Sequence, residues 1–154
     1  MSDARWFEVD TAVEAAVRHF TWAQSFYVRI EGTNAIEDRH LVEMAFMHAM
    51  QSGHTSLENT LLRVLDLCGE AAPTGATWHA DLIRRAARAL DGRPAILADV
   101  VAEAADVTRR FRNVAVHAYD SFDYTKAGEA VRGAGMIASL LPSEIARFRQ
   151  AMDP

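Results

Sequence analysis

The sequence predicts an all-α fold, an antiparallel bundle of four long helices and one short helix. Apolar residues recur at spacings of three and four through most of the chain, which is the period of an amphipathic helix. No stretch of useful length alternates apolar and polar residues in the period of a β-strand. Clusters rich in glycine, proline and asparagine separate the helical stretches. These three observations favour a helical bundle over any fold built on a sheet.

The 154 residues contain no internal repeat, no low-complexity segment and no linker long enough to divide them. We therefore expect one domain over residues 1–154, a length at which folding buries roughly 70% of the surface that the unfolded chain exposes.

Composition favours a soluble, cytoplasmic protein. The one cysteine, Cys68, excludes an internal disulfide and suits a reducing compartment. No apolar run approaches the roughly 18 residues of a membrane span, and the N-terminus lacks the pattern of a signal peptide. The formal net charge of -5 gives no general attraction to nucleic acid, so any RNA-binding surface has to be local.

The first helix is expected over about residues 10–30, with Asp10 as its N-cap. Gly32, Thr33 and Asn34 break the pattern after it. The residues expected to face the core are Val13, Val17, Phe20 and Trp22.

A second long helix is expected over about residues 35–67. Gly53 is a candidate interruption, and Cys68 with Gly69 is a good helix end. The apolar stripe of this helix is expected to include Leu41, Met44, Ala45, Met47 and, at the edge of the core, His48.

The short helix is expected over about residues 78–90 and the next long one over 94–119, with Pro94 in its first turn. An acidic turn follows at residues 120–123, where Asp123 or Ser121 would cap the last helix. That helix is expected to continue to about residue 152, with a kink at Pro142.

The helix over residues 94–119 has two distinct faces. The core face should contain Val100, Ala104, Val107, Phe111, Val114 and Ala118. The opposite face should present Arg109, Arg112, Asn113, Val116 and His117. Arg112 and His117 lie about 140° apart around an ideal helix, with the apolar Val116 between them. A two-fold copy of this face would cover Val116 and bring two arginines and two histidines into one cleft, so we expect a homodimer.

These residue types suit cleavage of a phosphodiester. Arg112 can hold two phosphate oxygens and stabilise developing charge, and His117 can move a proton near neutral pH. In RNA the neighbouring 2′-hydroxyl is the nucleophile, so no metal is required. Asn113 and Tyr119 can hydrogen-bond the phosphate, a base or the imidazole, and Arg109 belongs to a local basic cluster that can contact RNA. Judged by the spacing alone, Arg112 and His117 are more often a surface arginine and a helix-capping histidine than a catalytic pair.

The segment FRNVAVHAY, residues 111–119, resembles the signature of HepT-type HEPN ribonuclease toxins: an arginine, four residues, a histidine, one residue and a tyrosine. It ends the penultimate long helix, as in that family, and an acidic turn and a closing helix with Leu141 and Pro142 follow. The likeness is close over residues 109–124 and looser over most of the chain.

The resemblance implies a HEPN-type bundle and a homodimeric, cofactor-free endoribonuclease with Arg112 and His117 as its catalytic pair. It also implies a cognate nucleotidyltransferase antitoxin of the MNT type, which in this family can transfer AMP to the tyrosine of the motif, here Tyr119. Tyr124 is a second possible acceptor. The alternative is a HEPN module without activity that only binds such a nucleotidyltransferase.

Other signals are weaker. Glu37 and His40 have the spacing of two metal ligands on one helix face, but no second copy of the motif exists in the sequence, so we expect no metal site. His79 is more typical of a helix start, although it could line an RNA cleft. Cys68 has no neighbouring base, and there is no glycine-rich phosphate loop.

Overall fold

The computed structural model describes residues 3–117 and 123–153, without the side chains of residues 3 and 115–117. It contains α1 (Asp3–Glu31), α2 (Ile36–Leu67), α3 (Trp78–Ala86), α4 (Asp99–His117), the short 3-10 helix η2 (Tyr124–Lys126) and α5 (Gly128–Met152). The described residues contain no β-strand. The all-α prediction of four long helices and one short helix is confirmed.

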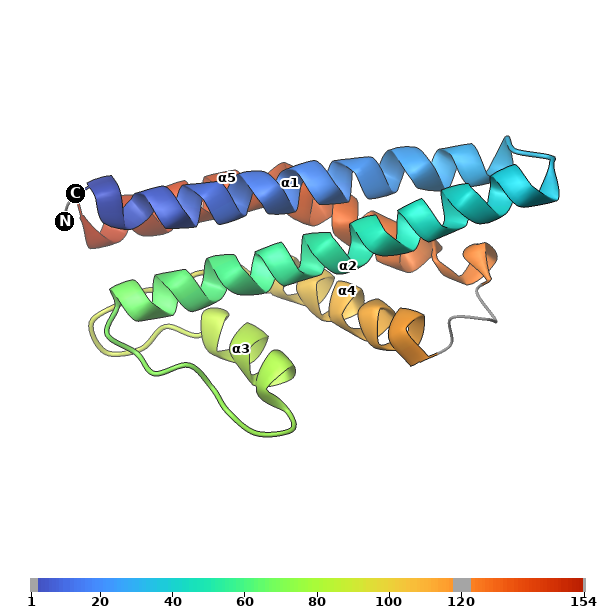
Figure 1. Cartoon of the computed structure of the whole chain (residues 1–154). Helices are drawn as coiled ribbons and strands as arrows, with labels where there is room; N and C mark the ends of the chain where they lie inside the picture. Colours follow the sequence, from blue (N-terminus) through green and yellow to red (C-terminus); the bar gives the residue numbers. More distant parts are fainter. Residues whose placement is uncertain (1–2, 118–122, 154) are drawn as a thin grey trace.

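The helices α1 and α2 run antiparallel along the length of the bundle, and α5 packs against α1 (Figure 1). Helix α4 lies between α2 and α5, and the short α3 packs against both α2 and α4. The buried side chains form one continuous core, with Phe20, Phe46, Leu57, Ile137 and Phe148 among its members. Among the described helices, none has the length and apolar character needed to cross a membrane.

Helix α1 begins earlier than the sequence predicts. It starts at Asp3, so Asp10 lies within the helix and is not its N-cap. Trp6 and Val9 are buried in the core, and this burial stabilises the additional turns. Trp22, expected in the core, is exposed instead.

Helix α2 passes through Gly53 without interruption, and Gly69 follows its end with a φ of 73°, as expected of a helix terminus. The ring of Phe20 lies where a side chain at Gly53 would lie: a Cβ there would come within 2.6 Å of Phe20 Cδ1. The predicted stripe is wrong in part, because Leu41, Met44 and His48 are exposed. The residues that face the core at this end are Val42, Phe46, Met47, Ala49 and Met50.

The segment between α3 and α4 is longer than predicted, because α3 ends at Ala86 and α4 begins at Asp99. Pro94 therefore lies in a loop and not in a first helical turn. The buried Arg93 organises this loop: it pairs with Glu70 and donates to the backbone carbonyls of residues 85, 88 and 94. The backbone N–H groups of residues 96 and 97 both donate to the carbonyl of Ala86, which replaces the expected helical bonds.

The buried face of α4 is rotated from the predicted one. Val100 and Val114 are exposed, whereas Val101, Ala105 and Thr108 are buried, because α2 and α5 flank the helix on two sides. Ala118, Tyr119 and the turn at 120–122 lie outside the described residues. Asp123 accepts a hydrogen bond from the Thr125 backbone N–H and so caps η2, not the last helix. Pro142 lies within α5, as predicted, and the kink expected at this residue remains a prediction.

Candidate functional site

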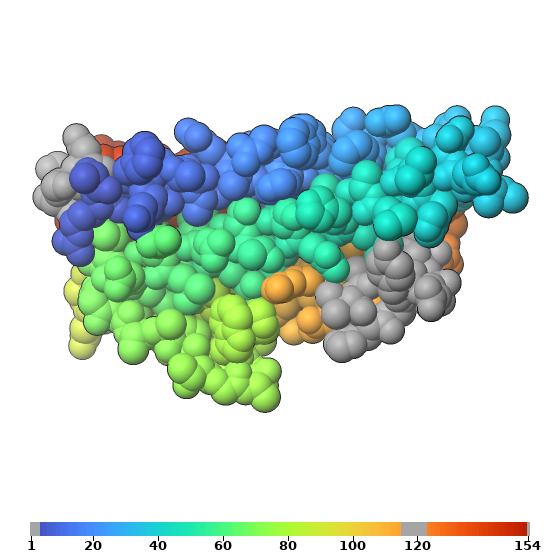
Figure 2. Space-filling view, in the orientation of Figure 1, coloured from blue at the N-terminus to red at the C-terminus, as the bar shows by residue number. Residues whose placement is uncertain are grey.

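A buried carboxylate lies where α2, α3 and α4 meet. Glu58 of α2 is 3% exposed, and both of its oxygens accept hydrogen bonds. Arg112 Nη1 of α4 donates to Oε1 at 2.8 Å, and His79 Nδ1 of α3 donates to Oε2. Figure 2 shows α3 and α4 meeting beside α2 on one face of the molecule. One carboxylate therefore connects a residue of the sequence motif to two other helices.

His54 lies one turn before Glu58 on α2 and is completely buried. Its Nδ1 is 2.8 Å from Thr108 Oγ1 on α4. Its Nε2 is 3.6 Å from Glu58 Oε2 and has no hydrogen-bond partner among the described residues. Burial lowers the pKa of His54, and the nearby Glu58 only partly opposes this shift. His54 is therefore a neutral, structural imidazole at neutral pH.

The charge state of Glu58 fixes the direction of its hydrogen bonds. Burial acts to raise the pKa of Glu58, but hydrogen bonds and charge interactions with His54 and His79 outweigh it, and the pKa is lowered. Glu58 is therefore ionised at neutral pH and can only accept. It follows that His79 Nδ1 carries a hydrogen, and that a neutral His79 has its lone pair on Nε2.

The sequence places Arg112 on the face of its helix opposite the core. In the structure its side chain instead turns inward to Glu58. Its side chain is 28% exposed and reaches Glu58 with one nitrogen of the guanidinium group. Its other nitrogens make no hydrogen bond to a described residue. The same side chain lines a polar hollow of about 460 Å³ on the surface of α2. The other residues lining this hollow are His48, Gln51, Ser52, Thr55 and Ser56.

The other predicted site residues are not all brought to this hollow. Arg109 binds Asp106 at 2.8 Å, one turn earlier on the same helix. Asn113 is exposed. His117 is the last residue of α4, and its side chain lies outside the part of the chain that is described, as does the whole of Tyr119. The convergence of Arg112 and His117 remains a prediction.

His79 is more than a helix-start residue. Its ring stacks on Trp78, with ring centroids 3.6 Å apart, and the side chain is 34% exposed. It shares Glu58 with Arg112 but is not among the residues that line the polar hollow, so its alternative role in an RNA cleft remains a prediction. The sequence pattern did not identify Glu58 or His54 as part of the site. The available signal was a glutamate four residues after a histidine on a helix face that otherwise carries Leu57, Leu61 and Leu65.

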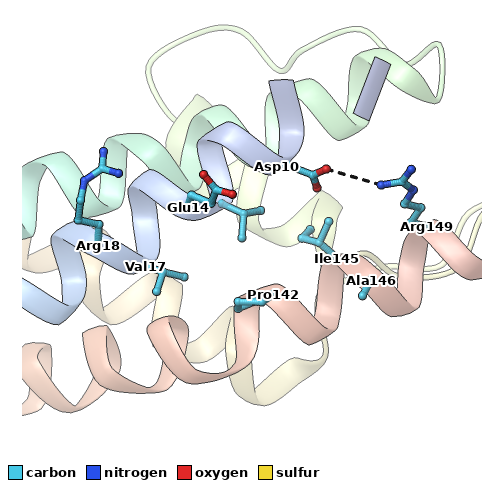
Figure 3. Close-up of a pocket in the computed structure, with 9 residues that line it drawn as sticks. Asp10, Glu14, Val17, Arg18, Pro142, Ile145, Ala146 and Arg149 are labelled. Carbon is cyan, nitrogen blue, oxygen red and sulfur yellow. Dashed lines mark ion pairs between the residues drawn. The ribbon is translucent and has the colours of Figure 1, made fainter. Parts of the chain in front are cut away.

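A second hollow of about 530 Å³ lies between α1 and α5 (Figure 3). Its floor is apolar, with Val13, Val17 and Pro142, and Asp10 pairs with Arg149 at its edge. Within the described ranges, no three or more histidine, cysteine, aspartate or glutamate side chains are grouped to hold a metal ion. The polar hollow is the better candidate site, because Arg112 of the sequence motif lines it.

Residues 45–152 match the family described as HepT-like protein. The chain belongs to the HepT-like family. The match covers most of the chain, from the middle of α2 to the end of α5, and so includes Glu58, His79 and Arg112 of this HepT-like protein. No curated protein and no solved structure matched the chain.

Proposed function

We propose that this HepT-like protein is a metal-independent endoribonuclease toxin, with its active site at Arg112 and His117 in the cleft of a homodimer. The observation that carries the proposal is the setting of Arg112. The buried Glu58 fixes one side of the guanidinium, and the other side borders a hollow lined by hydroxyl groups. Such an arrangement suits a phosphate, which accepts hydrogen bonds from both arginine and hydroxyl donors.

In the proposed reaction, the 2′-hydroxyl of one nucleotide attacks the adjacent phosphorus, and the bond to the 5′ oxygen of the next nucleotide breaks. The products are a 2′,3′-cyclic phosphate and a free 5′-hydroxyl. Arg112 stabilises the negative charge that develops on the phosphoryl oxygens. His117 takes part in proton transfer. Asn113, exposed next to Arg112, and Arg109 on the same helix are proposed as supporting RNA contacts.

The test is cleavage of tRNA and structured mRNA by the purified protein, freed of any antitoxin, in excess EDTA. We expect cleavage to survive EDTA and to be lost in His117→Ala, with a 2′,3′-cyclic phosphate at the new end. Equal cleavage by the wild type and His117→Ala would reject the assigned site. No cleavage by a folded wild-type protein would favour the alternative, a HEPN module that only binds a partner.

We further propose regulation by a cognate nucleotidyltransferase antitoxin that transfers AMP from ATP to the hydroxyl of Tyr119, two residues after His117, with release of pyrophosphate. An AMP group there would add bulk and negative charge beside the catalytic pair and compete with RNA for Arg112. The intact mass of the protein co-expressed with its antitoxin should rise by one or more AMP units, and Tyr119→Phe should prevent the increase. A neutralised toxin of unchanged mass would instead mean that the antitoxin acts by covering the site.

A further inference from the structure

We propose that His79 is a catalytic residue of this ribonuclease, the general base that removes the proton from the 2′-hydroxyl of RNA. The proposal rests on the proposed ribonuclease function and adds a residue outside the Arg112–His117 motif. Its basis is the geometry around Glu58, where an imidazole and a guanidinium bind opposite oxygens of one buried carboxylate.

The orientation of the His79 ring suits a general base. Glu58 accepts from His79 Nδ1, so the ring is held with Nε2 on the side away from the carboxylate. This is how a buried carboxylate fixes a catalytic histidine in other hydrolytic sites, where it sets the tautomer and stabilises the protonated ring. Trp78 stacks on the imidazole and restricts its rotation. His79 is therefore fixed in position and yet exposed enough to reach a substrate.

His79 also lies near Arg112. The two side chains bind the two oxygens of the Glu58 carboxylate, so in this proposal a phosphate held by Arg112 is within reach of the imidazole. In RNA, the attacking 2′-hydroxyl is attached to the sugar that carries the scissile phosphate. A base beside the phosphate-binding arginine is therefore correctly placed for this hydroxyl.

In the proposed step, His79 Nε2 takes the proton of the 2′-hydroxyl while its oxygen forms a bond to phosphorus. The bond from phosphorus to the 5′ oxygen breaks, and this oxygen takes a proton from the imidazolium of His117. The ring of His79 gains one proton and that of His117 loses one, and exchange with water restores both. A purely structural role for His79, as a partner of Glu58 and Trp78, is the competing explanation.

The experiment compares single-turnover RNA cleavage by the wild type and His79→Asn, because an asparagine amide retains a donor for Glu58 but provides no base. We expect the rate at neutral pH to fall by about 100-fold or more, while the RNA dissociation constant changes less than about threefold. His40→Asn, an exposed histidine at the other end of α2, serves as the matched control and should cleave as the wild type does.

A second substrate separates base from acid. RNA with sulfur in place of the 5′ oxygen at the mapped cleavage position has a leaving group that needs no proton. It should restore cleavage by His117→Ala but not by His79→Asn. Restoration of His79→Asn, or full activity of His79→Asn on ordinary RNA, would overturn the role of His79 and leave the ribonuclease function standing. A folded wild-type protein that cleaves no RNA would overturn both.

Discussion

Glu58 places a negative charge at a junction of three helices, and the two side chains that donate hydrogen bonds to it come from distant parts of the chain. Arg112 is 54 residues away in sequence and His79 is 21 residues away. A buried ion pair adds little net stability when compared with apolar packing, but removal of one partner leaves an uncompensated charge. Glu58 is therefore expected to matter both for the fold and for the position of Arg112.

Glu58→Gln should lower the free energy of unfolding by about 3 kcal/mol, because Arg112 would be left partly buried without its counter-charge. Urea denaturation followed by circular dichroism measures the loss. Glu103→Gln, which removes an exposed carboxylate from α4, should change stability by less than about 0.5 kcal/mol. A Glu58→Gln variant as stable as Glu103→Gln would show that the carboxylate does not hold these helices together.

His54 should make the fold sensitive to acid. Its pKa is lowered by burial, so the unfolded chain binds a proton more readily than the folded protein does. The free energy of unfolding should consequently keep its full value above about pH 6.5. It should decrease as the pH falls from there toward the lower pKa that His54 has in the folded protein. The lowered pKa of Glu58 adds a loss in the same direction at lower pH. The charged and titratable groups near His54 act on its pKa in both directions: Glu58 raises it, and Arg112 and His79 lower it.

Denaturation midpoints at pH 8 and pH 5.5 test this expectation. The difference between them should be smaller in His54→Gln than in the wild type, whereas His40→Gln, an exposed control, should retain the wild-type difference. The pKa of His19 is also lowered, and because His19 is unchanged in all three proteins, it contributes equally to the pH difference in each. An unchanged difference in His54→Gln would mean that His54 is not the acid-sensitive group.

Between the helices, one glycine allows α1 and α2 to approach closely at Phe20. Gly53 leaves space for the ring of Phe20, and a Cβ at this position would come within 2.6 Å of the ring. Gly53→Ala should destabilise the protein by about 1–3 kcal/mol, since the ring or the helices must move. Gly32→Ala is the matched control, because the nearest atom to its Cβ would be 3.9 Å away. Thermal denaturation of both variants compares them; equal melting temperatures would contradict the close packing.

The helices themselves were predictable from the sequence, because a period of 3.6 residues and strong end signals such as Gly69 depend on local properties. The start of α4, by contrast, was not predictable from the sequence. Pro94 suits a first turn by its own geometry, but the buried ion pair of Arg93 with Glu70 and the two N–H groups that share the Ala86 carbonyl hold this segment as a loop. These are long-range contacts, and no local pattern reports them.

At the scale of the whole molecule, sequence reasoning located Arg112 but not its surroundings. A short motif identifies an arginine, whereas the partner of that arginine depends on how α2, α3 and α4 pack. For this reason the sequence did not identify Glu58, a single charged residue on an apolar stripe, as the partner of Arg112. The composite site proposed for the homodimer involves a second copy of the chain, so its geometry depends on contacts beyond one protomer.

Mixing two inactive variants tests the composite site. If Arg112 of one subunit acts with His117 of the other, a heterodimer of Arg112→Ala and His117→Ala contains one intact site and one doubly altered site. After random subunit exchange, half of the dimers are mixed, and about a quarter of the wild-type RNase activity should return. An affinity tag on one of the two variants measures how far subunit exchange has gone. Complete exchange without any return of activity would place both residues of each site in one subunit.

In the proposed reaction Arg112, held by Glu58, binds the phosphate that is cleaved. The most direct measurement is the single-turnover rate of RNA cleavage for Arg112→Ala beside Arg110→Ala, which removes an exposed arginine two residues away on the same helix. We predict a loss of about 100-fold or more for Arg112→Ala and less than about threefold for Arg110→Ala, with both proteins folded. Cleavage by a folded Arg112→Ala variant at the rate of Arg110→Ala would contradict the claim.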